Sequence, residues 1–234
     1  MPVTSSRDTD DFLANLAYDS WWLDAEAYIA KQLHLELDQG EHLGDDWVLT
    51  PDDVILAGCQ RIIDSSPDPA VLDVLVAALR ASYHLQLVHA MLGQIAESVA
   101  ERWRSGDHAI PARSLLHRVS QAYRYGVKAR DLDFVLEMCS EPTFGPQDPD
   151  DGHDFRGYWF ESLAKIKDPR VGAFCRDIIK EDVGRWTDFR LAEAMRVAAK
   201  SWEPTDTEPF SRVAAEHPDS WIRQNAKRIL KRHA

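Results

Sequence analysis

The sequence predicts an all-helical protein built from stacked antiparallel helical hairpins, and three observations predict it. Helix signals dominate the 234 residues, whereas strand signals are nearly missing. One pattern, an apolar helical stripe followed by a short Asp/Pro break and another stripe, recurs near the C-terminus over 158–182, 188–217 and 218–232. Helices expected to start near Asp154, Asp188 and Asp219 are spaced 34 and 31 residues apart. Such an internal repeat is typical of stacked hairpins, which usually form binding surfaces rather than active sites.

The individual elements follow from start signals and apolar spacing. Thr50-Pro51-Asp52-Asp53 predicts a helix start, because it offers a capping hydroxyl, a proline at the first helical position and acids at the positive helix end. Asp68-Pro69 and Asp168-Pro169 repeat this kind of start. Apolar spacing predicts further helices over 10–18, 19–37, about 83–103, 111–126 and 131–139. Loops are expected over 38–49, which is acidic, and over 141–154, which is rich in Pro, Gly and Asp.

The repeats also predict which residues pack between helices. Counted from Asp188 and from Asp219, the third, seventh, tenth and eleventh following positions are small or apolar, as close helix packing requires. We therefore expect one buried face per helix, with Asp168 and Asp219 as capping residues. The residues expected in the core are Leu191, Met195, Ile222, Ala226, Ile229 and Leu230.

Two segments carry a family resemblance. ESLAKIKDPRVGAFCRDIIKED resembles the hairpin of HEAT-like repeats, especially the short variety found in phycobilisome-lyase-type proteins. EPFSRVAAEHPDSWIRQNAKRIL is similar to the same unit, and its second helix matches the pattern D-x-x-V-R-x-x-A-x-x-x-L at Asp219, Ile222, Arg223, Ala226 and Leu230. The repeat that begins at Asp188 departs from the pattern, with Ala192 in place of the arginine. The resemblance implies a right-handed α-solenoid in which the second helix of each pair lines the concave side.

The organisation expected from this resemblance is an acidic N-terminal helical cap and loop over 1–50, followed by a HEAT-like solenoid over 51–234 as part of one continuous domain. The match is best over 154–233 and fair over 51–100. The loop over 141–154 is then a long connection or a hinge rather than a domain boundary, since related repeat units are expected on both sides of it.

The charge is concentrated in the first quarter of the chain. The formal net charge is −12, and residues 1–60 hold 13 acidic and 2 basic residues. Such a field attracts basic surfaces and repels nucleic-acid backbones, so we expect a basic protein partner and no nucleic acid. The alternative is that the acids only keep the surface soluble.

Cysteine usage and hydropathy indicate the cellular compartment that the sequence predicts. Cys59, Cys139 and Cys175 are odd in number and far apart, which fits a reducing cytoplasm and argues against a disulfide framework or a zinc site. No apolar run is long enough for a membrane span, and residues 1–12 lack the apolar segment of a secretory signal. The sequence therefore predicts a cytoplasmic protein without a membrane segment.

No chemistry-bearing constellation stands out, so no cofactor or metal is expected. His84 and His89 are five residues apart, do not share a helical face well, and are interpreted as surface histidines. The acidic residues of 148–154 surround a glycine, which leaves calcium binding open beside a solvated turn, although the spacing is not that of an EF-hand. Nucleophile-elbow, P-loop, dinucleotide and zinc-protease motifs are missing, which favours a non-catalytic role.

Candidate contact residues come from acids and tryptophans. In the loop over 38–49, acids cluster beside an aromatic anchor, and these are the favoured partner-binding residues: Glu41, Asp45, Asp46 and Trp47. The chain has eight tryptophans, most of which are expected to fill gaps between helices. A secondary contact surface is predicted at two pairs of Trp and Arg: Trp186 with Arg190, and Trp221 with Arg223.

Two classes of function follow. The first is a non-catalytic protein-binding solenoid, one version of which is a bacterial immunity-type protein that neutralises a basic toxin; adaptors, chaperones and assembly factors share this composition. The alternative is a HEAT-like enzyme, either of the alkylpurine DNA glycosylase type, which needs a basic concave face with aromatic and acidic residues, or of the bilin-lyase type. Binding of DNA at physiological salt would discriminate between these classes.

Overall fold

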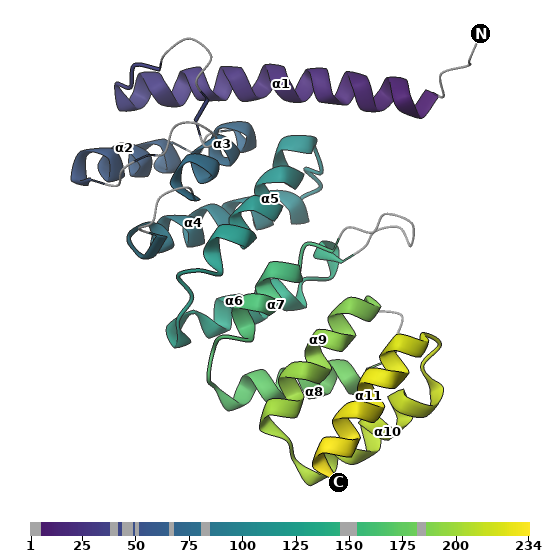
Figure 1. Cartoon of the computed structure of the whole chain (residues 1–234). Helices are drawn as coiled ribbons and strands as arrows, with labels where there is room; N and C mark the ends of the chain where they lie inside the picture. Colours follow the sequence, from purple (N-terminus) through teal and green to yellow (C-terminus); the bar gives the residue numbers. More distant parts are fainter. Residues whose placement is uncertain are drawn as a thin grey trace. The chain divides into compact units, whose positions relative to one another are not determined.

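The computed structural model describes residues 6–37, 42–43, 49, 52–65, 68–80, 85–145, 154–181 and 186–234, without the side chains of 6–19, 80 and 85–87. These residues form eleven α-helices joined by turns and short 3₁₀ segments, and no strand (Figure 1). The all-helical prediction is confirmed for this part of the chain. The chain divides into two compact units, Met1–Gly126 (unit 1) and Val127–Ala234 (unit 2).

Unit 1 is built around a helix that is buried on nearly every side. Helix α3 contacts α1, α4 and α5, and every residue of it from Leu72 to Leu79 is buried. A helix that is apolar all round is a core helix, and the single acid in it, Asp73, is paired with Arg118 at 2.8 Å. The helices of unit 1 are α1 (Ser6–Leu33), α2 (Asp53–Asp64), α3 (Pro69–Arg80), α4 (Leu85–Arg104) and α5 (Ile110–Tyr123).

Unit 2 consists of three helical hairpins. The pairs α6–α7, α8–α9 and α10–α11 pack against each other, and α9 further contacts both α7 and α11, while α8 contacts α10. The second helices of the hairpins therefore form one layer of unit 2. The helices are α6 (Leu132–Ser140), α7 (Gly157–Leu163), α8 (Pro169–Lys180), α9 (Asp188–Ala198), α10 (Thr207–Glu216) and α11 (Ser220–His233).

Side-chain caps begin three helices of unit 2, namely α8, α9 and α11. Asp168 accepts a hydrogen bond from the backbone N–H of Arg170, and Asp219 accepts from the backbone N–H groups of Trp221 and Ile222. Thr187 caps α9 in the same way. The predicted capping roles of Asp168 and Asp219 are confirmed, and they satisfy backbone donors that a helix start leaves without partners.

Two predicted helix starts are wrong. The stretch 10–18 and residues 19–33 are one helix, α1, because no Pro or Gly lies between them to interrupt it, and the predicted end at residue 37 is wrong because the helix ends at Leu33, before His34 with its positive φ of 54°. Helix α2 begins at Asp53, and its cap is the carboxylate of Asp52, which accepts from the N–H of Ile55. An Asp at this position can do the work that the sequence pattern assigned to the hydroxyl of Thr50.

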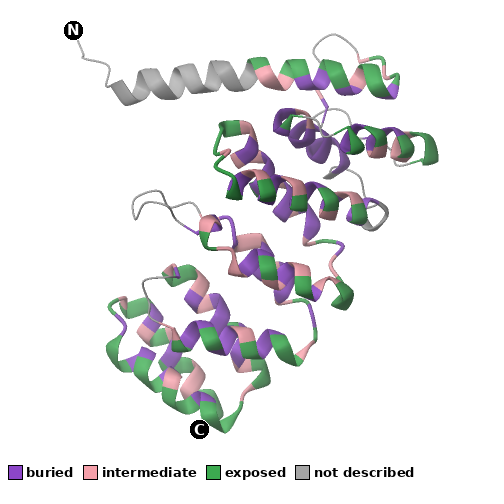
Figure 2. Cartoon of the chain, turned by 180° about the vertical axis from the view of Figure 1, so that it is seen from behind, coloured by how far each residue is buried: buried purple, intermediate pink, exposed green. Residues whose placement is uncertain are grey.

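The core lies where helices of one unit face each other, as the buried residues in Figure 2 show. Leu191, Met195, Ile222 and Ala226 are buried as predicted. Ile229 and Leu230 are only half-buried, which corrects their expected place in the core. They lie in the last turns of α11, the final helix of the chain, which contacts α9 and α10.

The predicted division of the chain at residue 50 stays a prediction. Within unit 1, α1 contacts α2 and α3, so the described N-terminal helix shares a core with the helices that follow it. Among the residues that the structure describes, no helix combines the length and the apolar character that a membrane span needs.

Candidate functional site

The layer formed by α7, α9 and α11 bears a groove of about 700 Å³. It lies within unit 2, and each of the three helices contributes residues to it. These three helices are the second helices of successive hairpins, so each hairpin contributes its second helix to the groove.

Small side chains make the floor of the groove. Three half-buried alanines line it: Ala164 directly after α7, Ala192 on α9 and Ala199 in the 3₁₀ extension of α9. Ile229 of α11 adds apolar surface beside them. Ala192 occupies the position at which the repeat that begins at Asp219 has Arg223.

Two large aromatic side chains stand exposed at the groove. Phe189 at the start of α9 is 57% exposed, and Trp221 at the start of α11 is 49% exposed. Full burial of a large apolar side chain is worth about 1.5–3 kcal/mol. About half of each of these two side chains stays exposed, so neither obtains the full gain within the chain. Exposed aromatic residues at a groove are typical of contact surfaces.

Cations dominate the rim. Lys165, Arg196, Arg228 and Arg232 line the groove and are all exposed. Helix α11 carries five Lys or Arg residues and no acid. The groove therefore presents positive charge, although the chain as a whole carries −12.

The buried acid of the groove, Glu193, already interacts with arginines of the chain. Glu193 is buried, bonds the guanidinium of Arg190 and lies 3.8 Å from that of Arg196. Burial raises the pKa of the Glu193 carboxyl from its usual value, and the charge of Arg190 opposes this rise only in part. Glu161 lies near Glu193 and contributes to the rise. The exposed rim consequently offers more cationic than anionic groups to a ligand.

A buried polar network joins the N-terminal ends of α7 and α9. Asp154 accepts hydrogen bonds from the guanidinium of Arg156 at 2.8 and 3.1 Å, from the Thr187 hydroxyl at 3.1 Å and from Arg190 at 3.3 Å. Its carboxylate is thus committed to cations and a hydroxyl of the chain. The question of calcium in the loop over 148–154 concerns residues 148–153, which lie outside the described residues.

The structure separates the predicted contact residues. Glu41, Asp45, Asp46 and Trp47 lie outside the described part of the chain, so their contact role stays a prediction. Of the secondary set, Trp221 lines the groove. Its neighbour Arg223 is directed to the end of α10, where it donates to the backbone carbonyls of His217 and Pro218 at 2.5 and 2.6 Å.

The other predicted pair is part of the core. Trp186 is 7% exposed, and its indole N–H donates to Glu181 at 2.8 Å. The side chain of Arg190 is 11% exposed and is held by Asp154 and Glu193. These positions agree with the core-packing alternative for the tryptophans. His89 is also buried, against the ring of Tyr123, which corrects its interpretation as a surface histidine; His84 lies outside the described residues.

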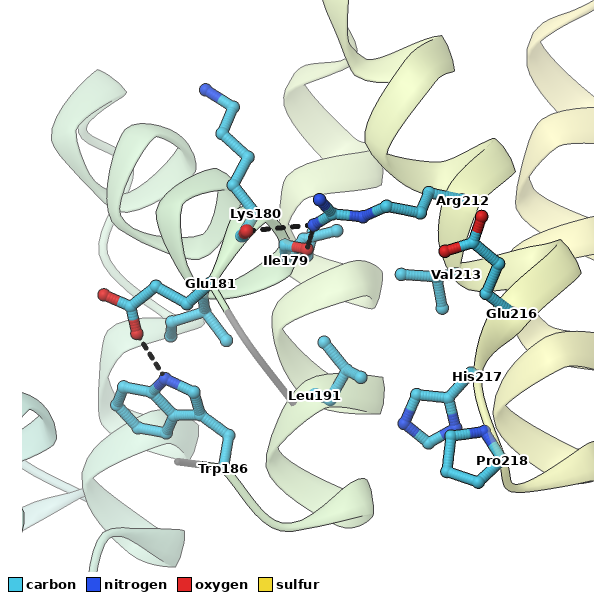
Figure 3. Close-up of a pocket in the computed structure, with 11 residues that line it drawn as sticks. Ile179, Lys180, Glu181, Trp186, Leu191, Arg212, Val213, Glu216, His217 and Pro218 are labelled. Atoms are coloured by element: carbon cyan, nitrogen blue, oxygen red, sulfur yellow. Dashed lines mark hydrogen bonds between the residues drawn. The ribbon is translucent and has the colours of Figure 1, made fainter. Parts of the chain in front are cut away.

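A second hollow, of about 370 Å³, lies between the C-terminal ends of α8 and α10 (Figure 3). Apolar side chains such as Leu191 and Val213 form much of its lining. Arg212 crosses it and donates to the carbonyls of Ile179 and Lys180 at 3.3 and 2.9 Å, which are the last carbonyls of α8. The guanidinium therefore supplies hydrogen-bond donors to carbonyls that have no partner within α8 at its C-terminal end.

The buried imidazole of His217 borders this hollow. Its Nδ1 accepts a hydrogen bond from the backbone N–H of Asp219 at 3.1 Å, and its Nε2 lies 3.6 Å from the Asp188 carboxylate. One nitrogen thus faces the start of α11 and the other faces the start of α9. The arrangement favours a structural role for His217 at the junction of α9, α10 and α11.

No family model, curated protein or solved structure matches the sequence. The HEAT-like resemblance therefore stays a prediction. Within the described ranges, no cluster of three or more His, Cys, Asp or Glu side chains is arranged to hold a metal ion.

Residues of the groove that sequence reasoning missed are its alanine floor and its arginine rim: Ala164, Ala192, Ala199, Arg196, Arg228 and Arg232. The departure at Ala192 from the repeat pattern was visible in the sequence. Ala192 lines the groove, but only the packing of α7, α9 and α11 shows that the three helices share it.

Proposed function

We propose that the protein is a non-catalytic protein-binding α-solenoid of HEAT-like hairpins, and that the groove of unit 2 is a partner-binding surface. The observation that carries the proposal is the pair of exposed aromatic residues, Phe189 and Trp221, beside a floor of alanines and an arginine rim. Aromatic and arginine side chains supply most of the binding energy at protein interfaces. Support for a repeated build comes from the successive hairpins of unit 2.

A photo-crosslinking experiment tests this surface. A benzophenone amino acid placed at Phe189 or Trp221 should give protein adducts in cells of the source organism. The matched control is the same substitution at Ile110, which is 46% exposed in unit 1. Equal adducts at all three positions, or adducts at none, would contradict a binding surface at the groove.

We further propose that the acidic N-terminal quarter contacts a basic protein partner, with a toxin as the version that corresponds to an immunity role. The support is the clustering of 13 acids against 2 bases in residues 1–60. Complementary charge speeds association and makes it sensitive to salt. Reversal of Glu41, Asp45 and Asp46 to Lys should slow capture of the partner and flatten its salt dependence, at unchanged helicity. An association rate that ignores both salt and these reversals would reduce the acids to a solubility feature.

The HEAT-like enzyme remains the second candidate, because the groove combines cations, aromatic residues and acids. A glycosylase would bind DNA in such a groove through its phosphates, with an affinity that falls steeply with salt. Clear DNA binding at physiological salt would favour it over a protein-binding role. A toxin-like gene beside this one would favour the immunity version, whereas a repair or pigment operon would favour an enzyme.

A further inference from the structure

We infer that the α7–α9–α11 groove takes an acidic amphipathic helix of a partner protein. This inference rests on the proposed function and names the chemistry of the partner at that surface. It differs from the basic partner expected at the acidic N-terminal quarter, since the charge of the groove has the opposite sign.

The lining of the groove suits the apolar face of a helix. A helix lying in a groove presents apolar side chains at intervals of three and four residues along one face. The alanine floor of Ala164, Ala192 and Ala199 lets such a face approach the layer closely, and Ile229 extends the apolar contact. Phe189 and Trp221 both lie at helix starts, on α9 and α11, and offer anchors for two apolar residues of the ligand.

The charge of the rim selects an acidic ligand. Lys165, Arg196, Arg228 and Arg232 are exposed around the apolar floor. Arginine binds carboxylates through two parallel hydrogen bonds, so Asp or Glu on the flanks of the ligand helix can pair with the rim. Glu193 is buried and bonded to Arg190 and also lies 3.8 Å from Arg196, so Arg228 and Arg232 are the rim arginines expected to meet most of the ligand carboxylates.

An acidic protein helix fits better than a nucleic acid. The acids of a peptide can be confined to the flanks that meet the arginines, whereas a nucleic-acid backbone carries a negative charge at every phosphate. Glu161 and Glu193 also line the groove, and a phosphate chain along it would pass both. A ligand with an apolar stripe makes use of the floor, which phosphates do not.

The test uses the full-length protein and a fluorescein-labelled amphipathic peptide of about 20 residues, with Leu on one face and Glu on the others. Binding is followed by fluorescence anisotropy. The comparison probes are the same peptide with Lys in place of Glu, and a single-stranded oligonucleotide. We expect the acidic peptide to bind, with an affinity that decreases as salt increases.

Two charge reversals on the same helix provide a matched comparison. Arg228→Glu with Arg232→Glu should weaken binding about tenfold or more, because both residues line the groove. Lys227→Glu with Lys231→Glu makes the same change of charge at exposed positions of α11 outside the groove lining, and should change the affinity by less than about threefold. Trp221→Ala should also weaken binding about tenfold. Circular dichroism checks that each variant keeps its helices.

Each remaining outcome overturns the inference. Three results would rule out an acidic helix as the ligand of the groove. They are absence of binding at peptide concentrations of about 1 mM, an equal loss of affinity from both double reversals, and preference for the basic peptide. Tighter competitive binding of the oligonucleotide would assign the groove to nucleic acid. Concentration-dependent dimers that are lost in the Arg228/Arg232 variant would assign it to a second copy. A cellular adduct at Trp221 to a protein without an acidic helix would overturn this inference and leave the proposed function standing.

Discussion

The guanidinium of Arg156 lies 4.3 Å from the ring centre of Trp186, and both side chains are buried in unit 2. The same guanidinium donates to Asp154, which also accepts from the hydroxyl of Thr187. Arg156 precedes α7, and Thr187 is the cap of α9. The contact therefore belongs to a network that joins the N-terminal ends of two helices that line the groove.

Loss of Arg156 should destabilise unit 2 strongly. Arg156→Ala removes the cation from a buried ion pair and leaves Asp154 with fewer partners, a change that typically costs about 3–5 kcal/mol. The measurement is the free energy of unfolding by urea, followed by circular dichroism. Arg170→Ala is the control, because Arg170 pairs with Asp133 and Asp168 near the surface, and it should change the unfolding midpoint far less than Arg156→Ala does. Equal effects of the two substitutions would show that the buried network does not hold the two helices.

The sequence was sufficient for the local structure of unit 2. Asp168 and Asp219 stand directly before an apolar-periodic helix, and the cap depends only on a short side chain and nearby backbone donors. The buried positions of Leu191 and Met195 on α9 and of Ile222 on α11 likewise follow from helical spacing. These features depend on residues within one or two turns, which a sequence displays directly.

Features that depend on the packing of distant segments were harder to predict. An Arg beside a Trp occurs both at binding surfaces and in cores, and only the position of Asp154, 36 residues before Arg190, shows that Arg190 is inside. The groove needs three helices at once, so its floor could not be predicted from any one repeat. The half-buried state of Ile229 depends on which sides of α11 its neighbours cover.

Ile222 and Ile229 should differ in their contributions to stability. Ile222 is fully buried, so Ile222→Ala should lower the free energy of unfolding by about 2–5 kcal/mol. Ile229 is half-buried at the groove, so Ile229→Ala should cost less, while it weakens binding of the acidic peptide. Urea titrations and peptide anisotropy separate the two effects. A larger stability loss at Ile229 than at Ile222 would contradict the described packing of α11.

The three cysteines should be unreactive in the folded protein. Burial raises the pKa of the Cys59 thiol to about 11 and that of the Cys175 thiol to about 12, and it also raises the pKa of Cys139 well above its usual value. Alkylation requires the thiolate, so iodoacetamide at about pH 8 should label these residues slowly until urea opens the fold. Mass spectrometry of peptides reports Cys59 for unit 1 and the other two cysteines for unit 2. Rapid labelling of any one of them without urea would show that its surroundings are open.

The charge of Asp168 should make stability depend on pH in the acid range. Its pKa lies below the usual 3.8 because its carboxylate accepts a hydrogen bond from the backbone N–H of Arg170 and another from the Arg170 guanidinium. In the window just below 3.8, the unfolded chain therefore binds more protons at this site than the folded chain does. Stability consequently increases with pH across that window, and the contribution is complete above it.

Asp168→Asn keeps a side-chain cap but removes the charge, so it isolates this contribution. The difference between the unfolding midpoints of the wild type and Asp168→Asn should be largest near neutral pH and should shrink as the pH is lowered through the folded pKa of Asp168. Arg170→Ala removes the guanidinium contact but keeps the backbone N–H, so it should reduce the pH dependence without abolishing it. Urea midpoints measured at several pH values from about 7 down to about 3 provide the comparison. A difference that stays constant over this range would mean that the carboxylate acts only as a hydrogen-bond acceptor at the start of α8.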